Sequence, residues 1–221
     1  MPAIRTLRGF NDHGMDRVVR DFWDRKFDSL KAPYAETNHT LAKCGLVEAL
    51  ANSDLANRTT LIVLRRDLAK QCVSYIMRND FTNITLDWQW YLNPKYRNLI
   101  VNPVAFQNLG QIGTALWYCC EMETRQAYYL QKYAGQLSFV EARLEQIATP
   151  EGAATLLQAL GHTGPVTLPP RSNANTAAAP PELLTEVRRL LDQLPFDPHK
   201  IAAKYLAAGR DLARPPMTRA A

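Results

Sequence analysis

Two arginines, a lysine and a serine follow an apolar run in an order that suits anion binding. Residues 61–75 read LIVLRRDLAKQCVSY, with Lys70 and Ser74 four and eight positions after Arg66. At about 100° per residue, positions spaced this way stay on one side of an α-helix. A guanidinium binds a phosphate through two parallel hydrogen bonds, and a helix N-terminus adds partial positive charge and free N–H groups. The spacing therefore predicts an anion site formed by Arg66, Lys70 and Ser74.

A plainer interpretation of the same residues stays open. Arg66 and Lys70 would then be solvated cations at the start of a helix, and Ser74 a neutral residue on it. Arg65 lies one position out of register, so we expect it to face adjoining packing or solvent. Spacing alone does not choose between the two interpretations.

Hydrophobic periodicity predicts the elements that would position these residues. Residues 59–65, TTLIVLR, are an unbroken β-branched and leucine run, typical of a central strand buried on both faces in a parallel sheet. Apolar residues at helical spacing then predict a helix over 67–79. The arginines would lie at the carboxyl end of the strand, which is the rim where open α/β sheets bind ligands.

Helices and strands alternate along the rest of the chain. Helices are predicted over 14–30, 41–50, 105–133, 150–160, 182–194 and 198–208, and further strands over 33–40 and 136–140. This alternation predicts an α/β fold with a parallel sheet flanked by helices. We expect one α/β domain over residues 1–161, a Pro/Asn-rich loop over 162–181, and C-terminal helices with a tail over 182–221.

The composition fits a globular chain without a membrane span. The chain has 221 residues and a formal net charge of +5. No apolar run approaches the roughly 18 residues that cross a bilayer, and no block of about five or six like charges suggests a nucleic-acid partner. The first residues lack the apolar centre of a secretory signal, which predicts a cytoplasmic protein. The four cysteines and four histidines show no metal-ligand spacing, so we expect reduced, buried thiols and no metal.

The segment 61–75 resembles the 3′-phosphate-binding segment of sulfotransferases that use 3′-phosphoadenosine 5′-phosphosulfate (PAPS). In that family a strand ends in an arginine and a serine follows eight positions later, as Arg66 and Ser74 do here. YAETNHT, residues 34–40, is similar to the preceding strand of bacterial members, and LSFVEARLEQIATPEGAATLLQALG is similar to a later strand and short helix. The resemblance implies a P-loop-nucleotide-kinase-like sulfotransferase fold, PAPS as co-substrate, and a small-molecule, glycan or lipid hydroxyl as acceptor.

One part of the family pattern is absent from the sequence. Family members open with a strand and a Gly-rich loop whose N–H groups hold the 5′-phosphosulfate, and no GxxxxGK[ST] or similar turn occurs here. Converging N–H groups need small residues, so other residue types do not easily replace such a loop. We therefore expect an N-terminally shortened member with an incomplete fold, or a non-catalytic remnant that binds a nucleotide or a partner.

If the transfer chemistry is retained, it needs a base near the acceptor hydroxyl and cations near the leaving phosphate. The resemblance places the base at the end of the ETNH segment. His39 is preferred there, because its unperturbed pKa of about 6.5 suits proton removal near neutrality. Glu36 is the alternative base, since some members of the superfamily use a carboxylate there. Either residue has a structural alternative, His39 as a capping turn residue and Glu36 as a surface or ion-paired carboxylate.

Two further segments are candidates for ligand contact. Family members commonly close the 3′-phosphate site from a C-terminal loop, so the resemblance implies that Arg171 folds over the nucleotide; the alternative is a linker. Trp88, Trp90, Tyr91 and Tyr96 form either an acceptor platform or the packing of a long connection.

Glu123 is an acidic residue on the apolar stripe of the predicted long helix. An unpaired carboxylate there would be costly. Arg125 is only two positions away and does not face it on a helix. We therefore expect a partner for Glu123 at the rim of the sheet.

Overall fold

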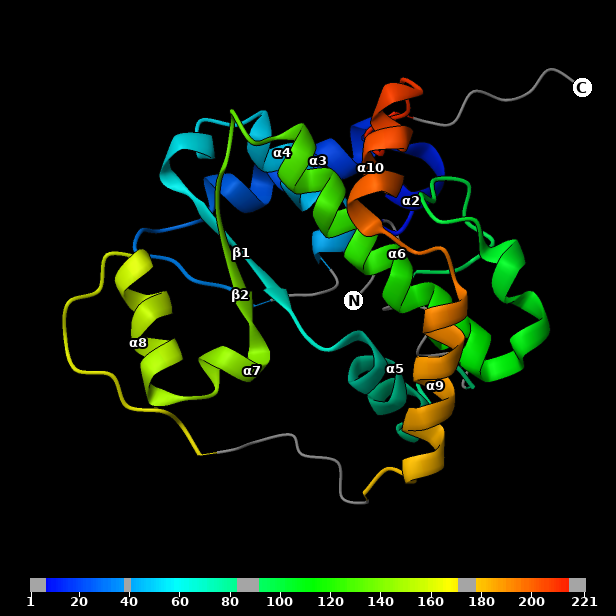
Figure 1. Ribbon diagram of the computed structural model, residues 1–221. Helices are drawn as coiled ribbons and strands as arrows, with labels where there is room; N and C mark the ends of the chain where they lie inside the picture. The colour runs from blue at the N-terminus through cyan, green and yellow to red at the C-terminus, as the bar shows by residue number, and fades with distance from the viewer. Residues whose placement is uncertain (1–6, 38–40, 83–91, 171–177, 215–221) are drawn as a thin grey trace, which may run out of the picture.

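The computed structural model describes residues 7–37, 41–82, 92–170 and 178–214, and shows helices around a small parallel sheet (Figure 1). The strands are β1 (Thr60–Arg65) and β2 (Ser138–Arg143). The α-helices are α2 (Phe10–His13), α3 (Arg17–Asp28), α4 (Leu46–Ala51), α5 (Leu68–Met77), α6 (Gly110–Lys132), α7 (Leu144–Ile147), α8 (Pro150–Ala159), α9 (Pro181–Gln193) and α10 (Pro198–Ala207). Short 3₁₀ helices are Leu41–Lys43, Ala56–Arg58 and Pro103–Leu109. The predicted α/β class with a parallel sheet and flanking helices is confirmed.

The two strands end at the same edge of the sheet. They run parallel, with Thr60 opposite Ser138 and Arg65 opposite Arg143. Helix α5 follows β1 at this edge and α7 follows β2 (Figure 1). Polar side chains that come directly after the two strands are therefore brought to one rim.

The exposure of β1 differs from the prediction. Its side chains alternate, with Val63 buried but Ile62 and Leu64 46% and 43% exposed. Within the described residues, β1 pairs only with β2. The prediction of a central strand buried on both faces is wrong. An unbroken apolar run occurs in strands that are covered on one face as well as in strands covered on both, so it does not distinguish the two.

Most predicted helices are confirmed, and three other segments differ from their predicted form. Residues 33–37 of the predicted strand 33–40 form no strand, and residues 38–40 lie outside the described residues. β2 begins at Ser138 and continues to Arg143, beyond the predicted end at residue 140. The predicted long helix is divided into a 3₁₀ turn and α6, which begins at Gly110.

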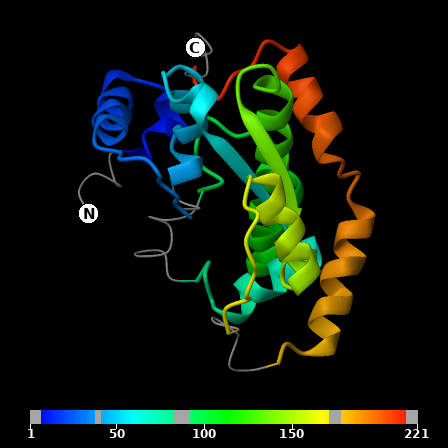
Figure 2. The same ribbon diagram turned by 90° about the vertical axis from the view of Figure 1, so that its left-hand side faces the viewer.

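Two clusters of apolar side chains form the core, and α6 contributes to both. One cluster joins α6 to α3 and α10, and the other joins it to α5 and α9. Figure 2 shows α9 and α10 along one side of the molecule and α3 on the other, with the sheet between them. All four cysteines are buried free thiols, as predicted. None of the described helices has the length and apolarity needed to cross a membrane.

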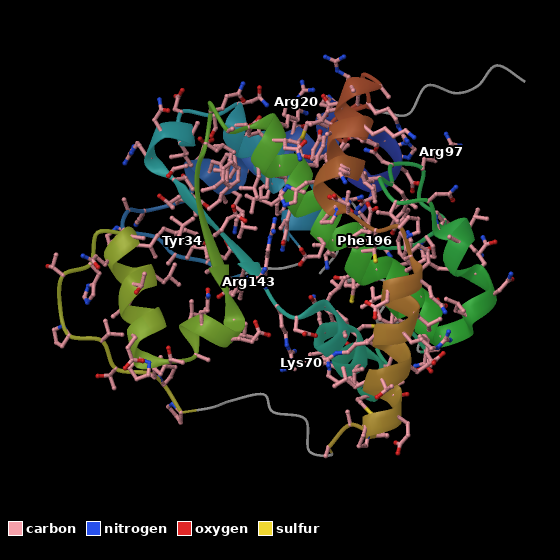
Figure 3. The ribbon with its side chains drawn as sticks, viewed as in Figure 1. Arg20, Tyr34, Lys70, Arg97, Arg143 and Phe196 are labelled. Atoms are coloured by element: carbon pink, nitrogen blue, oxygen red, sulfur yellow. The ribbon has the colours of Figure 1, made fainter. Side chains whose placement is uncertain are left out.

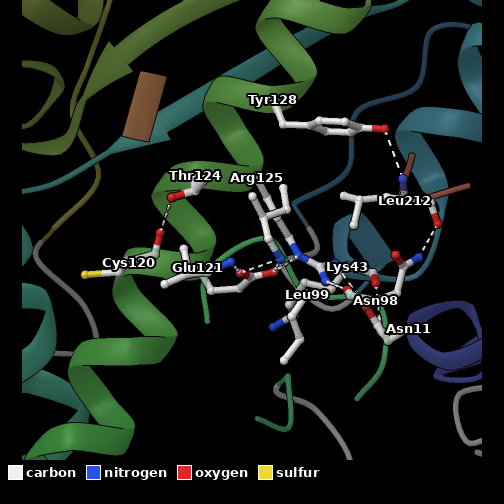
Figure 4. A network of polar contacts seen from close by, with 12 residues as sticks. Asn11, Lys43, Asn98, Leu99, Cys120, Glu121, Thr124, Arg125, Tyr128 and Leu212 are labelled. Atoms are coloured by element: carbon white, nitrogen blue, oxygen red, sulfur yellow. Dashed lines mark hydrogen bonds and ion pairs between the residues drawn. The ribbon is translucent and has the colours of Figure 1, made fainter. Parts of the chain in front are cut away.

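A buried ion pair on α6 ties distant segments together (Figure 4). The Glu121 carboxylate accepts from Arg125 Nε at 2.7 Å and from Val101 N at 2.7 Å. Arg125 also donates to Asn11 Oδ1 at 3.0 Å and to the Asn98 carbonyl at 2.8 Å. Both side chains are almost fully buried, with 1% or less of either exposed. This network connects the N-terminal residues, the chain before α6 and α6 itself.

Candidate functional site

A pocket of about 190 Å³ lies where β1 passes into α5. Its lining residues are Leu64, Arg65, Arg66, Gln71, Ser74, Tyr75, Arg78 and Leu144. The structure thus brings the predicted pair Arg66 and Ser74 to one pocket. None of these eight lining residues is acidic, and three of them are arginines.

One face of α5, together with the residue that follows it, supplies half of the lining. Gln71, Ser74, Tyr75 and Arg78 follow one another at steps of three, one and three residues, which places them on adjacent rows of a helix. Ser74 is 9% exposed, and its Oγ accepts from Arg78 Nη1 at 3.1 Å. A buried hydroxyl and a guanidinium therefore lie side by side on the pocket wall.

Arg65 lines the pocket from the end of β1 and also faces two carboxylates. Its Nε lies 3.9 Å from Glu123 Oε2, and its Nη2 lies 3.5 Å from Glu141 Oε2. Both nitrogens are buried, yet neither makes a hydrogen bond with the described residues. Burial raises the pKa of Glu123, and the charge of Arg65 opposes that shift. The prediction that Glu123 has a partner at the sheet rim is confirmed.

Lys70 is not brought into the pocket. It does not line the pocket, and its exposed side chain stands at the start of α5 (Figure 3). At about 100° per residue, Lys70 is turned by roughly 90° from the middle of the lining face, because the pocket lies on the other side of Ser74. Arg66 precedes the helix, which begins at Leu68. Helical spacing counted from Arg66 therefore does not give the position of Lys70 correctly.

Carboxylates already occupy the N-terminus of α5. Asp67 Oδ1 accepts from Lys70 N at 2.8 Å, and Glu145 Oε1 accepts from Asp67 N at 3.1 Å. The prediction that free N–H groups at this helix end add to the anion site is therefore wrong for these two groups. Any anion in the pocket is bound mainly by side chains.

Glu36, one of the two predicted bases, is held in an ion pair. Its Oε2 accepts from Lys26 Nζ at 2.8 Å and from Tyr34 Oη at 2.7 Å. Burial lowers the pKa of Lys26, but the hydrogen bond and charge of Glu36 outweigh it and raise that pKa overall. Glu36 does not line the pocket, so the geometry favours the ion-paired alternative for it.

Several predicted residues fall outside the described part of the chain. These are His39, Arg171, Trp88, Trp90 and Tyr91. Tyr96, the remaining member of the predicted aromatic platform, is half-buried against the apolar cluster around α5 and α6. Burial raises the pKa of its hydroxyl, which agrees with a packing role for this residue.

Arg78 is a pocket residue that the sequence reasoning missed. It lies four positions after Ser74, and the i, i+4 relation on a helix is the signal that would have found it. The predicted site included Lys70, four residues before Ser74, but not Arg78, four residues after it. Arg65, expected to face adjoining packing or solvent because it is one position out of register with Arg66, also lines the pocket.

The lining has the chemistry that an anionic ester group requires. Three guanidinium groups, a hydroxyl and an amide supply hydrogen-bond donors, and planar guanidinium forks match the oxygens of phosphate and sulfate. Leu64, Tyr75 and Leu144 supply apolar surface against which a sugar could pack. In the described ranges no three His, Cys, Asp or Glu side chains lie close enough together to hold a metal ion.

The comparisons with known proteins add nothing to this geometry. Protein-family models, curated proteins and solved structures give no match to the chain. The function of the pocket is therefore inferred from its own residues.

Proposed function

We propose that the protein binds PAPS, or its product adenosine 3′,5′-bisphosphate, with the 3′-phosphate in this pocket, and that it has a P-loop-like sulfotransferase fold. Its reaction would be sulfuryl transfer to an acceptor hydroxyl. The observation that carries the proposal is that Arg66 and Ser74 line one pocket at the carboxyl end of a parallel strand. That end of a sheet is where α/β folds bind their ligands.

The size of the pocket favours a phosphate group as the part that is enclosed. A volume of about 190 Å³ is below the roughly 300 Å³ of pockets that enclose a whole small ligand. A phosphate and part of its ribose fit such a volume. The adenine would then lie outside this pocket, against residues that do not line it.

The transfer step needs groups beyond the pocket. As the bond from the acceptor oxygen to sulfur forms, the bond from sulfur to the leaving phosphate breaks, and the acceptor proton passes to a base. We propose His39 as that base, because Glu36 would first have to leave its ion pair with Lys26. The acceptor would be a small-molecule, glycan or lipid hydroxyl in the cytoplasm, a compartment that suits reduced, buried cysteines.

Nucleotide binding is tested with adenosine 3′,5′-bisphosphate at millimolar concentration. It should raise the melting temperature of the wild type and leave that of Arg66→Ala unchanged. Arg189→Ala is the matched control, because Arg189 is an exposed arginine of α9 that pairs with Glu186 and does not line the pocket; this variant should respond like the wild type. A wild type that ignores the nucleotide overturns the proposal.

A second candidate function is nucleotide binding without transfer, which the missing Gly-rich loop favours. Incubation with PAPS and phenolic, glycan and lipid acceptors separates the two. Sulfated product that disappears in His39→Ala, with nucleotide binding intact, supports transfer. Tight nucleotide binding without any product supports the non-catalytic alternative.

A further inference from the structure

Arg78, the residue that follows α5, contacts three neighbours among the described residues. Its Nε and Nη2 donate to Asp80 Oδ2 at 3.0 and 2.6 Å, and its Nη1 donates to Ser74 Oγ at 3.1 Å. The guanidinium carbon lies 5.0 Å from the centre of the Tyr75 ring. The planar group is thus oriented by a carboxylate, a hydroxyl and an aromatic face before any ligand enters the pocket.

Three carboxylates lie beside arginines of the pocket. Asp80 pairs with Arg78, while Glu123 and Glu141 lie beside Arg65. None of these three carboxylates lines the pocket. Asp80 thus orients the Arg78 guanidinium, and none of the described side chains that line the pocket is acidic.

We propose that Arg78 is a phosphate ligand beside Arg66 and Ser74, oriented by Asp80, and that it makes the pocket select a phosphate monoester over a diester. This inference rests on the proposed function, since it concerns the same phosphate. On binding, a phosphate oxygen replaces Ser74 Oγ as the acceptor for Arg78 Nη1, and the released Ser74 hydroxyl donates to the phosphate.

The charge and oxygen count of the ligand carry the selectivity. A phosphate monoester has a charge of about −1.5 to −2 at pH 7 and three terminal oxygens. Each of those oxygens can accept from a different one of Arg66, Ser74 and Arg78. A diester has one terminal oxygen fewer and a single charge, so one of the three donors is left without its acceptor.

A matched pair of nucleotides tests this selectivity by titration calorimetry. Adenosine 3′-monophosphate is a monoester, and adenosine 2′,3′-cyclic monophosphate is a diester with the same base and sugar. The wild type should prefer the monoester by roughly tenfold or more, since one charged hydrogen bond contributes about 1.5–3 kcal/mol.

The substitution Arg78→Lys keeps the positive charge and removes the planar fork. It should weaken binding of the monoester roughly 10- to 100-fold and leave binding of the cyclic diester nearly unchanged. Asp80→Asn should also lower the preference for the monoester, because the guanidinium loses its orienting partner. Asp80→Glu should restore the preference, which a merely structural loss would not do.

The outcomes distinguish this inference from the proposed function. If Arg78→Lys retains the wild-type preference while Arg66→Ala loses both nucleotides, the role of Arg78 is overturned and the phosphate pocket stands. If the wild type binds neither these nucleotides nor adenosine 3′,5′-bisphosphate, both proposals fall. Matching urea midpoints and near-ultraviolet circular dichroism of Arg78→Lys and the wild type serve as the folding control, and Arg189→Ala as the control for removing an arginine charge.

Discussion

The molecule uses arginine in two different ways, in the buried network on α6 and in the pocket at the sheet rim. Arg125 is 1% exposed, and each of its three guanidinium nitrogens donates a hydrogen bond (Figure 4). Arg65 is also largely buried, yet two of its nitrogens make no hydrogen bond with the described residues. The Arg125 guanidinium is fully hydrogen-bonded, whereas the Arg65 guanidinium lies 3.9 and 3.5 Å from the carboxylates of Glu123 and Glu141.

This difference separates a structural charge from a candidate binding charge. A buried charge with complete hydrogen bonding fixes the geometry of the segments around it, and removing one partner leaves the other in a low dielectric. A charge such as that of Arg78, whose side chain is 45% exposed, adds little to stability because water screens it. We therefore expect substitutions in the network to change folding and substitutions in the pocket to change binding.

The largest expected effect is on the network side. Glu121→Ala leaves the Arg125 guanidinium buried without its carboxylate, which should lower the free energy of unfolding by about 3–5 kcal/mol. Urea denaturation measures this loss. Glu186→Ala breaks an exposed ion pair on α9 and should change little. Equal losses in the two variants would contradict the contrast between the two regions.

Glu48 of α4 is a buried carboxyl group near that network. It is 1% exposed, and burial raises its pKa to about 7. The folded protein therefore keeps a proton that the unfolded chain has lost above its ordinary pKa of 4.5. Stability should fall as the pH rises from 4.5 to 7, by roughly 3 kcal/mol in total.

Glu48→Gln should remove this part of the pH dependence, because glutamine does not titrate. Urea midpoints measured between pH 5 and 8 test it, with the exposed Glu186→Gln as the control that should follow the wild type. Parallel profiles for Glu48→Gln and the wild type would show that Glu48 keeps an ordinary pKa in the folded protein.

The two faces of β1 repeat the contrast between closed and open surroundings. Val63→Thr places a hydroxyl on the buried face and should cost about 1–3 kcal/mol. Ile62→Thr changes the exposed face and should stay within about 0.5 kcal/mol of the wild type. Thermal denaturation of this matched pair measures the difference, and a large loss in Ile62→Thr would indicate that a partner covers this face.

The smallest expected effect concerns Glu145, the carboxylate at the N-terminus of α5. The hydrogen bond from the Asp67 N–H, with the charges of Arg66 and Lys70, lowers the pKa of Glu145. Because this carboxylate is negative beside the proposed phosphate site, Glu145→Gln should tighten binding of adenosine 3′,5′-bisphosphate about two- to fivefold. Calorimetry at low salt tests this, with Glu151→Gln on α8 as the control; weaker binding in Glu145→Gln would mean that Glu145 supports the site.

Local spacing predicted those parts of the site that one element carries. Arg66 and Ser74 were found because both belong to a single strand-to-helix unit, in which the position along the chain defines the position in space. Lys70 shows the limit of this reasoning, since it shares the predicted side of α5 with Ser74 but lies off the face that lines the pocket. The hydrogen bond from Arg125 to Asn11 could not be predicted, because 114 residues separate the two in the chain.

The sequence by itself determined most of the helices, the two strands that form the sheet, the placement of basic residues at a strand end, the burial of the cysteines and the need for a partner at Glu123. Periodicity encodes these features because it records which side chains share one face of an element. Only the tertiary structure decided that Arg78 and Arg65 join the pocket, that Lys70 stays outside it, and that one face of β1 is open. Which face of an element is covered depends on elements far away in the chain, and no local pattern contains that information.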